Sequence, residues 1–149
     1  MSHTCCCSLF HCVFATKNRC KTISADIQPR LGEYIGGIAR KHGMKALVVG
    51  GMEDHVHILL SLPSTLPLGQ AMREIKSASS RWMHETCNLQ HFEWQEGYGA
   101  FSIGTTQIAA TLGYIADQAE HHKKHDFQAE FISFLKKHRV EYDPRYIWS

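Results

Sequence analysis

The chain has 149 residues, of which 44% are hydrophobic and 20% are charged. This length and balance predict one soluble globular domain over residues 1–149, large enough to bury a core. A formal net charge of +2 at pH 7 is too small to indicate a polyanionic partner by itself. No run of about 20 apolar residues is present, so we expect no membrane-spanning segment.

The six cysteines do not form a disulfide framework. Five of them lie in the first 20 residues and three are consecutive, namely Cys5, Cys6, Cys7, Cys12, Cys20 and, far from the rest, Cys87. Adjacent cysteines have few opposite partners, and no pair of CxxC motifs has the spacing of a zinc site. Without a basic segment followed by an apolar stretch at the N-terminus, we expect a reducing, cytoplasmic location.

Hydrophobic patterning predicts the order strand, helix, strand, strand, helix, strand and then two helices. Strands are expected at 8–16, 44–51 and 55–62, and the Gly-broken stretch 92–103 is a strand or an irregular hairpin. Helices are expected at 26–42, after Pro67, from Thr105 to about His122, and at 127–138. The β-α-β-β-α-β order predicts an α+β, ferredoxin-like (RRM-like) sandwich, with an antiparallel sheet, helices on one face and additional C-terminal helices.

Two histidines, His55 and His57, begin the expected strand "HVHILLSL". Side chains two residues apart in a strand share one face, with roughly 6.6 Å between their Cα atoms. Two imidazoles placed in this way can converge on one metal ion and leave room for a third ligand, a substrate oxygen and water, which suits a catalytic site. The alternative is a pair of partly exposed strand histidines without a metal.

The stretch "TLGYIADQAEHHKKH" predicts a helix with two faces. At 100° per residue, one stripe contains groups that can touch a metal or a phosphate: Tyr114, Gln118, His121 and His125. A separate apolar face is expected to pack on the sheet: Ile108, Leu112, Ile115, Ala116 and Ala119. A tyrosine off the packing face is a candidate nucleophile for phosphoryl transfer to an activated phosphate. The alternative is an ordinary boundary tyrosine on a solvated face.

The motifs "HVHILL", "YIADQAEHH" and "SASSRWMHE…FEWQEGYGAFSI" resemble the single-tyrosine HUH transposases of bacterial insertion sequences, including the REP-associated tyrosine transposases. The resemblance runs from "VFATKNR" to "EYDPRYIW". It implies that Tyr114 is the nucleophile and that the metal ligands are His55, His57 and Gln118. The cysteine-rich start, "HTCCCSLFHC", departs from the family's usual lead-in to the first strand.

This resemblance also implies a cofactor, a substrate and an assembly. The expected metal is Mg²⁺ or Mn²⁺, and the expected partner is single-stranded DNA with hairpins at the element ends. Cleavage would give a 5′-phosphotyrosine and a free 3′-OH. From helix geometry alone, and not from the resemblance, we expect His121 or His122 to position a phosphate or transfer a proton. A homodimer is expected, in which the tyrosine helix of one subunit can complete the site of the other. The protein would act on the bacterial nucleoid.

Basic side chains in two segments are candidates for contacts with DNA phosphates. Lys17 and Arg19 follow the first strand, and the second helix carries Arg73, Lys76 and Arg81 on its expected outer face. A solvated surface is the alternative for this group. Trp94, Tyr98 and Phe101 could stack on bases, although core packing is the expected role for at least two of them.

Two rival functions share the expected fold. A non-catalytic module that binds single-stranded nucleic acid would need basic and aromatic groups on the sheet, without the two histidines, the tyrosine and the glutamine together. A domesticated HUH nicking endonuclease would keep the chemistry and lose mobility. A histidine-triad hydrolase is excluded because position 59 is leucine in place of the third histidine. A catalytic zinc hydrolase is a further alternative, although the sequence has no HExxH-type helix.

Overall fold

A computed structural model describes residues 1–149, and its elements confirm the predicted order. The strands are β1 (Leu9–Ala15), β2 (Lys45–Met52), β3 (His55–Ser61) and β4 (Gly99–Ile103). The α-helices are α1 (Ile27–Lys41), α2 (Leu68–Glu85), α3 (Ile108–Ala116), α4 (Gln118–His121) and α5 (Phe127–Lys137). Two short 3₁₀ helices, η1 (Lys17–Arg19) and η2 (Thr105–Gln107), follow β1 and precede α3.

The four strands form one antiparallel sheet in the order β2-β3-β1-β4. With α1 and α2 as the two crossovers, this is the predicted ferredoxin-like sandwich. The fourth strand begins only at Gly99, whereas the sequence allowed a strand from residue 92. In the segment before it, Trp94 makes a single bridge to Thr16 and its ring is buried in the core.

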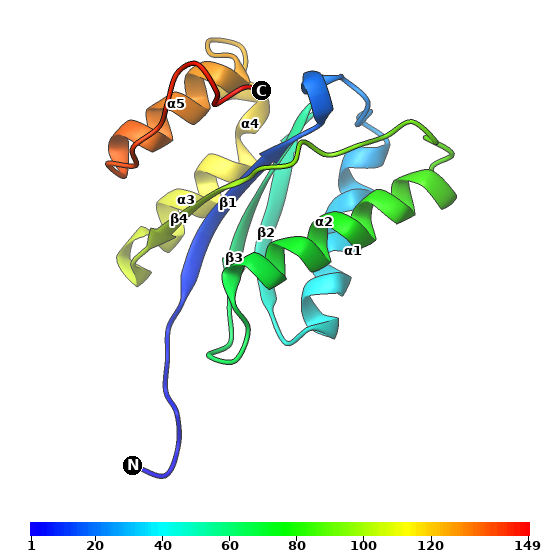
Figure 1. Ribbon diagram of the computed structural model, residues 1–149. Coiled ribbons are helices and arrows are strands. Elements are labelled where there is room, and N and C mark those ends of the chain that lie inside the picture. The colour runs from blue at the N-terminus through cyan, green and yellow to red at the C-terminus, as the bar shows by residue number, and fades with distance from the viewer.

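Helices cover both faces of the sheet, as Figure 1 shows. Strand residues that point toward α1 and α2 belong to the larger core, among them Cys12, Phe14, Val56, Ile58 and Leu60. The alternate residues Val13 and Ala15 pack with Phe127 and Leu135 of α5 in a smaller cluster. The expected one-sided helical layer is therefore α1 and α2, and the C-terminal helices lie over the opposite face.

Helix α1 shows why the sequence folds onto this sheet. Leu31, Ile35 and Ile38 recur at helical spacing and are buried, and each such side chain contributes about 1.5–3 kcal/mol when it is removed from water. The helix ends where Gly43 adopts a left-handed φ of 76°, a conformation that a residue without a Cβ adopts at no steric cost.

The prediction of one continuous helix from Thr105 to about His122 is wrong, because the structure divides this stretch into three segments. Residues 105–107 form a 3₁₀ turn, and the α-helical backbone is interrupted at Asp117, where φ is −97° and ψ is 24°. Ile115 is buried as expected, but Ala116, the last residue of α3, and Ala119, which follows the break, are exposed. The helix approaches β2 closely, since a Cβ atom on Gly50 would lie 2.6 Å from the carbonyl oxygen of Ile115.

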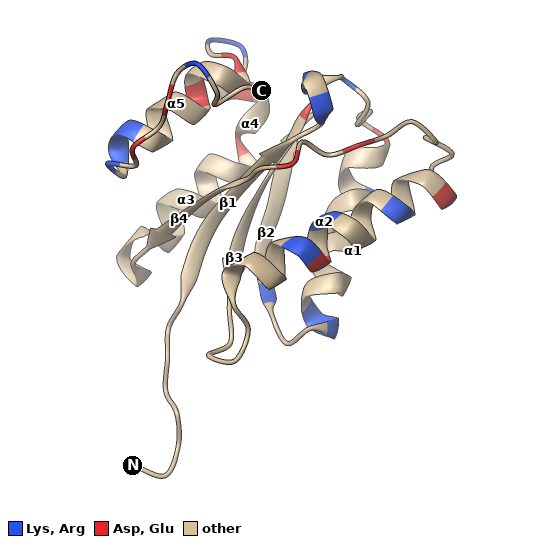
Figure 2. Ribbon diagram, viewed as in Figure 1, with Lys and Arg blue, Asp and Glu red and all other residues tan.

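Charged residues lie on helices and loops, and the strands contain one, Lys45 at the start of β2 (Figure 2). The titratable side chains on the sheet surface under α3–α5 are instead histidines: His11, His55 and His57. None of the helices has the length and apolar character that a membrane span requires.

Candidate active site and metal centre

His55 and His57 lie on the same face of β3, as predicted, and their ring centroids are 5.1 Å apart. The neighbouring Val56 and Ile58 point into the other core. Both histidines are fully buried, so the alternative of partly exposed strand histidines is wrong. Two buried imidazoles need polar partners, and those partners define the site.

Asp54 orients His55. Its Oδ1 atom lies 2.6 Å from Nδ1 of His55, where a carboxylate can only accept a hydrogen bond. Burial raises the pKa of Asp54, but the hydrogen bond and charge of His55 outweigh it and keep that pKa below its usual value. With a proton on Nδ1, the Nε2 atom of a neutral imidazole presents a lone pair to the site.

Gln118 presents a second lone pair to the same point. Its Oε1 atom lies 3.1 Å from Nε2 of His55, while its amide nitrogen donates to the carbonyl oxygen of Tyr114 at 3.4 Å. This arrangement turns the amide oxygen inward. Two acceptors that face each other at this distance favour a cation between them.

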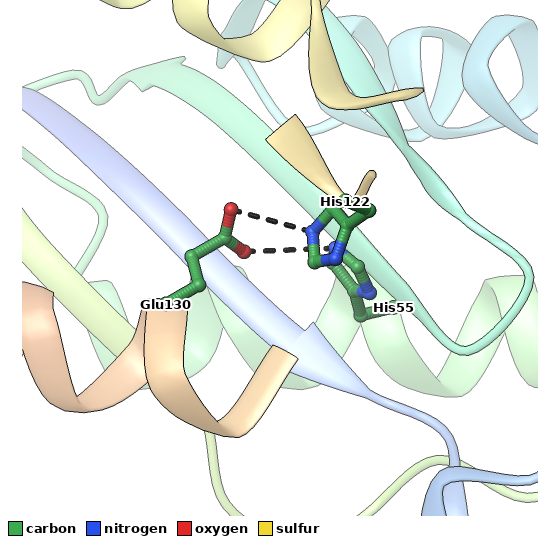
Figure 3. Close-up of side chains that lie close together, drawn as sticks. All are labelled: His55, His122 and Glu130. Carbon is green, nitrogen blue, oxygen red and sulfur yellow. Dashed lines mark ion pairs between the residues drawn. The ribbon is translucent and has the colours of Figure 1, made fainter. Parts of the chain in front are cut away.

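Glu130, which the sequence analysis did not identify, reaches into the site from α5. Its Oε1 atom lies 2.8 Å from Nε2 of His57. Figure 3 shows its other two contacts, in which Oε1 lies 3.6 Å from Nε2 of His55 and Oε2 lies 3.4 Å from Nε2 of His122. Ligand atoms of His55, His122 and Glu130 all lie within 4.8 Å of one another. In the sequence, Glu130 could have been recognised as a carboxylate on the otherwise apolar face of α5, between Phe127 and Phe134.

The pair of Glu130 and His57 is a carboxylate beside a neutral imidazole. Burial lowers the pKa of His57 and outweighs the attraction of Glu130. Burial raises the pKa of Glu130, but the hydrogen bonds of His57 and Tyr114 outweigh it and hold that pKa well below its usual value. His57 therefore donates its Nε2–H to Glu130.

The hydroxyl group of Tyr114 donates to Oε2 of Glu130. The Tyr114 ring is half-buried, with its centroid 5.8 Å from that of His57 and 4.3 Å from that of His121. Burial, together with the hydrogen bond and charge of Glu130, raises the pKa of Tyr114 above its ordinary value. The phenol consequently keeps its proton at neutral pH.

The structure brings His122, and not His125, into the cluster. The helical wheel put His125 on the stripe of Tyr114 and put His122 to one side of it. After the break at Asp117, Gln118 and His122 are one helical turn apart, and Nε2 of His122 lies 3.1 Å from Oε1 of Gln118. His125 is exposed. His121 remains beside Tyr114, as the stripe predicted.

A cavity of about 540 Å³ opens beside Tyr114, between α3 and α5. Its titratable lining residues are Tyr114, Glu130, Lys137 and the four histidines His11, His121, His125 and His138. Pockets of this size accommodate ligands as large as a nucleotide. Since the histidine pair is itself fully buried, this cavity is the opening through which a substrate can reach Tyr114.

The five basic residues expected to contact DNA do not converge on this cavity. Lys17 pairs with Glu93 at 2.7 Å on the surface, and the guanidinium of Arg19 lies 5.8 Å from the ring centroid of Trp148. The ammonium of Lys76 donates to the carbonyl oxygens of residues 95, 96 and 97. Arg73 and Arg81 are exposed on α2, beyond the opposite face of the sheet.

Of the three aromatic residues considered for base stacking, two pack in the core, as expected. Trp94 and Phe101 are buried, and the indole N–H of Trp94 donates to Oγ of Ser79 at 3.0 Å. Tyr98 is exposed and is free of the core.

The side chains present fit a divalent metal ion. His55 and His57 offer imidazole nitrogens, and Gln118 and Glu130 offer an amide oxygen and a carboxylate oxygen. Oxygen donors of this kind suit Mg²⁺ and Mn²⁺, and imidazole is a common ligand of transition metals. The inward-facing acceptors on His55 and Gln118 give this fit an independent basis in the geometry.

Residues 7–118 match the family model of IS200-like transposases. This span contains His55, His57, Tyr114 and Gln118 and ends before Glu130. The ISDra2 transposase TnpA of Deinococcus radiodurans is 27% identical over 74 residues, which make up 50% of this chain and 53% of that protein. The match therefore spans about half the length of that relative. The transposase for insertion sequence element IS200 of Salmonella typhimurium is 25% identical over 120 residues, 76% of this chain and 78% of that protein.

Two solved structures share the fold. A candidate transposase from Deinococcus radiodurans R1 superposes with a TM-score of 0.63 at 21% identity, over 79% of this chain and 95% of that chain. The REP-associated tyrosine transposase bound to a REP hairpin superposes with a TM-score of 0.58 at 20% identity, over 82% of this chain and 74% of that chain. These similarities agree with the ferredoxin-like sheet described above.

Proposed function

We propose that this chain, which belongs to the family of IS200-like transposases, cleaves and rejoins single-stranded DNA through a covalent bond to Tyr114. The observation that carries the proposal is the meeting of the half-buried Tyr114 with the buried Gln118 and histidine pair in one cluster. Each of these residues comes from the part of the chain that matches the family model.

His55, His57 and Gln118 would hold Mg²⁺ or Mn²⁺, with Oε1 of Glu130 as a further ligand. When bound, such an ion polarises a phosphate oxygen and offsets the charge that develops on it. Asp54 sets the direction of His55, and the carbonyl oxygen of Tyr114 sets the direction of Gln118. The ligands are therefore oriented by contacts that are already present in the chain.

Tyr114 would act on a phosphodiester that enters through the adjoining cavity. Its Oη atom attacks the phosphorus, the bond from phosphorus to the 3′-oxygen breaks, and the products are a 5′-phosphotyrosine and a 3′-OH. Oε2 of Glu130 already accepts the phenol hydrogen bond and is placed to take that proton, while the leaving 3′-oxygen acquires one. The tyrosine ester keeps the energy of the broken bond, so a later 3′-OH can rejoin the strand without a nucleotide cofactor.

Two histidines have different proposed roles. His121 lies against the ring of Tyr114 at the cavity and would position the phosphate or transfer a proton there. His122 contacts Oε1 of Gln118 and lies near Oε2 of Glu130, so it would hold those two oxygens in place. Substitution of each by glutamine separates these roles, since only the His122 variant should weaken metal binding.

The proposed substrate is single-stranded DNA with a hairpin near the cleavage site. The relative of known structure whose fold this chain shares is bound to a REP hairpin. Contacts of Lys17, Arg19, Arg73, Lys76 and Arg81 with the strand remain part of the proposal. Because Lys76 already donates to three carbonyl oxygens, we expect the smallest contribution to DNA affinity from that residue.

A homodimer is also part of the proposal, and Tyr114 could serve either the site of its own chain or the site of the partner subunit. Within one chain, Tyr114 already meets Glu130 and approaches His57. Mixing a Tyr114→Phe variant with a His57→Ala variant distinguishes the two assemblies. Restored cleavage requires a site shared between subunits, and continued inactivity places each site within one chain.

The rival binding module fits the geometry less well. RRM-type modules bind single strands on the open face of the sheet. Here that face is covered by α3–α5, and its histidines are buried against Gln118 and Glu130. The cluster of metal-binding side chains has no role in such a module, which favours the catalytic function.

The test is incubation of the purified protein with labelled hairpin oligonucleotides, in Mn²⁺, in Mg²⁺ and in EDTA, followed by a denaturing gel. We expect a metal-dependent covalent adduct that is lost in Tyr114→Phe and kept in the surface control Tyr98→Phe. Retarded DNA on a native gel without any adduct would favour the binding module. Adducts that persist in Tyr114→Phe would overturn the assignment of the nucleophile.

A further inference from the structure

We propose that His11 is a positioning residue for the metal ligand His57. His11 lies on β1, and its Nε2 atom is 2.8 Å from Nδ1 of His57 on the adjacent strand β3. The inference deepens the proposed function, because it concerns the same metal centre. His11 does not belong to any of the motifs identified in the sequence.

The sheet register explains why these two rings meet. His11 pairs with Leu59, and Val13 pairs with His57, so His11 and His57 are diagonal neighbours on one face. Diagonal neighbours across antiparallel strands are within reach of long or aromatic side chains. The two ring centroids are 5.0 Å apart.

His11 is held rigidly in this position. It is 4% exposed, and its ring meets the ring of Phe134 edge-on with centroids 4.9 Å apart. Tyr114 lies on another side, at 6.0 Å between centroids. Burying a polar ring between two aromatic rings costs free energy that an apolar side chain would not cost. This cost indicates that a ring nitrogen of His11 has a function.

The two metal-ligand histidines have different outer partners. Nδ1 of His55 faces the carboxylate of Asp54, which can only accept a hydrogen bond and so fixes one tautomer with a free Nε2 lone pair. Nδ1 of His57 faces a neutral imidazole, which can either donate or accept. Each of the two histidines thus has one outer partner at Nδ1.

Both ring nitrogens of His57 have partners, and these fix the direction of the ring. Nδ1 of His57 lies 2.8 Å from Nε2 of His11, and Nε2 of His57 lies 2.8 Å from Oε1 of Glu130. Because His11 holds the Nδ1 side, Nε2 of His57 points toward Glu130, whose Oε1 atom also lies 3.6 Å from Nε2 of His55.

Nε2 of a neutral His11 can donate a hydrogen bond to Nδ1 of His57 or accept one from it. The bond that orients the His57 ring is therefore possible in either tautomer of His57, including the one whose Nε2 lone pair a metal needs. A carboxylate at position 11 could only accept, and an apolar ring could do neither.

The experiment compares His11→Phe with His11→Gln. Phenylalanine keeps a ring against Phe134 and removes the hydrogen bond, whereas the glutamine amide can donate or accept. Mn²⁺ affinity is measured on the DNA-free protein from the electron paramagnetic resonance signal of free Mn²⁺. Losing an outer-shell partner typically costs 10- to 100-fold in metal affinity. We expect a loss of that size in His11→Phe and recovery to within about threefold of the unchanged protein in His11→Gln.

Equal Mn²⁺ affinity in His11→Phe and the unchanged protein would overturn the proposal, and so would a His11→Gln variant that binds Mn²⁺ as weakly as His11→Phe. If the unchanged protein bound no Mn²⁺, the metal centre and this inference would both fail. Loss of adduct formation with intact Mn²⁺ binding would refute the proposed cleavage reaction alone.

Discussion

Substitution of Gly50 by alanine tests whether α3 is placed by its contact with β2. An added Cβ would lie 2.6 Å from the carbonyl oxygen of Ile115 and 2.9 Å from its Cγ2 atom, whereas ordinary contacts begin at 3.4 Å. The helix must therefore retreat by about 0.8 Å, the difference between 3.4 and 2.6 Å. Overpacking of this kind costs about 1–3 kcal/mol, and each kcal/mol lowers Tm by about 2–4 °C in a chain of this size.

The same retreat moves Tyr114, which directly precedes Ile115. A displacement of about 1 Å can reduce a reaction rate about 100-fold, so we expect adduct formation to fall by roughly one to two orders of magnitude. Thermal unfolding and single-turnover cleavage measure the two effects. The matched control is Gly113→Ala in α3, where an added Cβ meets nothing within 4 Å. In that control, the free energy of unfolding should rise by about 0.5–1 kcal/mol, because alanine favours a helix more than glycine does. Unchanged stability in Gly50→Ala would refute the packing of α3 on β2.

Three further predictions concern charge. Burial and the nearby His57 lower the pKa of His11 from 6.5 to about 3. Between pH 6.5 and pH 3, His11 therefore binds a proton in the unfolded chain but not in the folded protein. The free energy of unfolding consequently falls as the pH falls through this range. At pH 5, about 2 kcal/mol should be lost at this site, and urea unfolding in EDTA should show a shallower pH dependence in His11→Gln. Glu130→Gln should weaken Mn²⁺ binding at least about tenfold in calorimetry, because an anionic ligand becomes neutral; equal affinity would exclude Glu130 as a ligand. Lys76→Met should lower the free energy of unfolding by about 1–3 kcal/mol, because three carbonyl oxygens lose their donor. If Lys76 instead contacts a phosphate, the salt dependence of DNA binding should become less steep, with a slope smaller by about one.

The fold could be predicted because its signals are local. Alternating strand residues such as Phe14 and Ile58, and the helical spacing of Leu31 and Ile35, indicate each element without knowledge of the others. The order of elements then restricts the topology to a ferredoxin-like sheet, which the structure has. The break at Asp117 was missed because a helical wheel assumes continuity, and no proline or glycine marks the interruption.

Part of the site could also be predicted from spacing. The period of a strand places His55 and His57 on one face, and the period of a helix places Gln118 one turn after Tyr114. Their burial could not be predicted, since it depends on α5, which returns over the sheet from beyond the residues that match the family model.

The remaining partners depend on tertiary contacts. His11 reaches His57 only through the pairing of β1 with β3, and Glu130 reaches both His55 and His57 only when α5 docks. In the sequence they are single polar residues among apolar neighbours, separated from the histidine pair by more than 40 residues. A buried polar residue on an apolar face is the general signal for such partners, and it gives no indication of which group it meets.

The central claim is that Tyr114 forms a covalent bond to DNA beside a metal held by the histidine pair. The most direct test is mass spectrometry of the protein after reaction with a hairpin oligonucleotide and Mn²⁺, with nuclease digestion of the DNA before peptide analysis. We predict a nucleotide attached through its 5′-phosphate to the peptide that contains Tyr114, and no such mass when EDTA replaces Mn²⁺ or when His57 is alanine. A nucleotide attached to another residue, or an adduct that forms equally in EDTA, would contradict the claim.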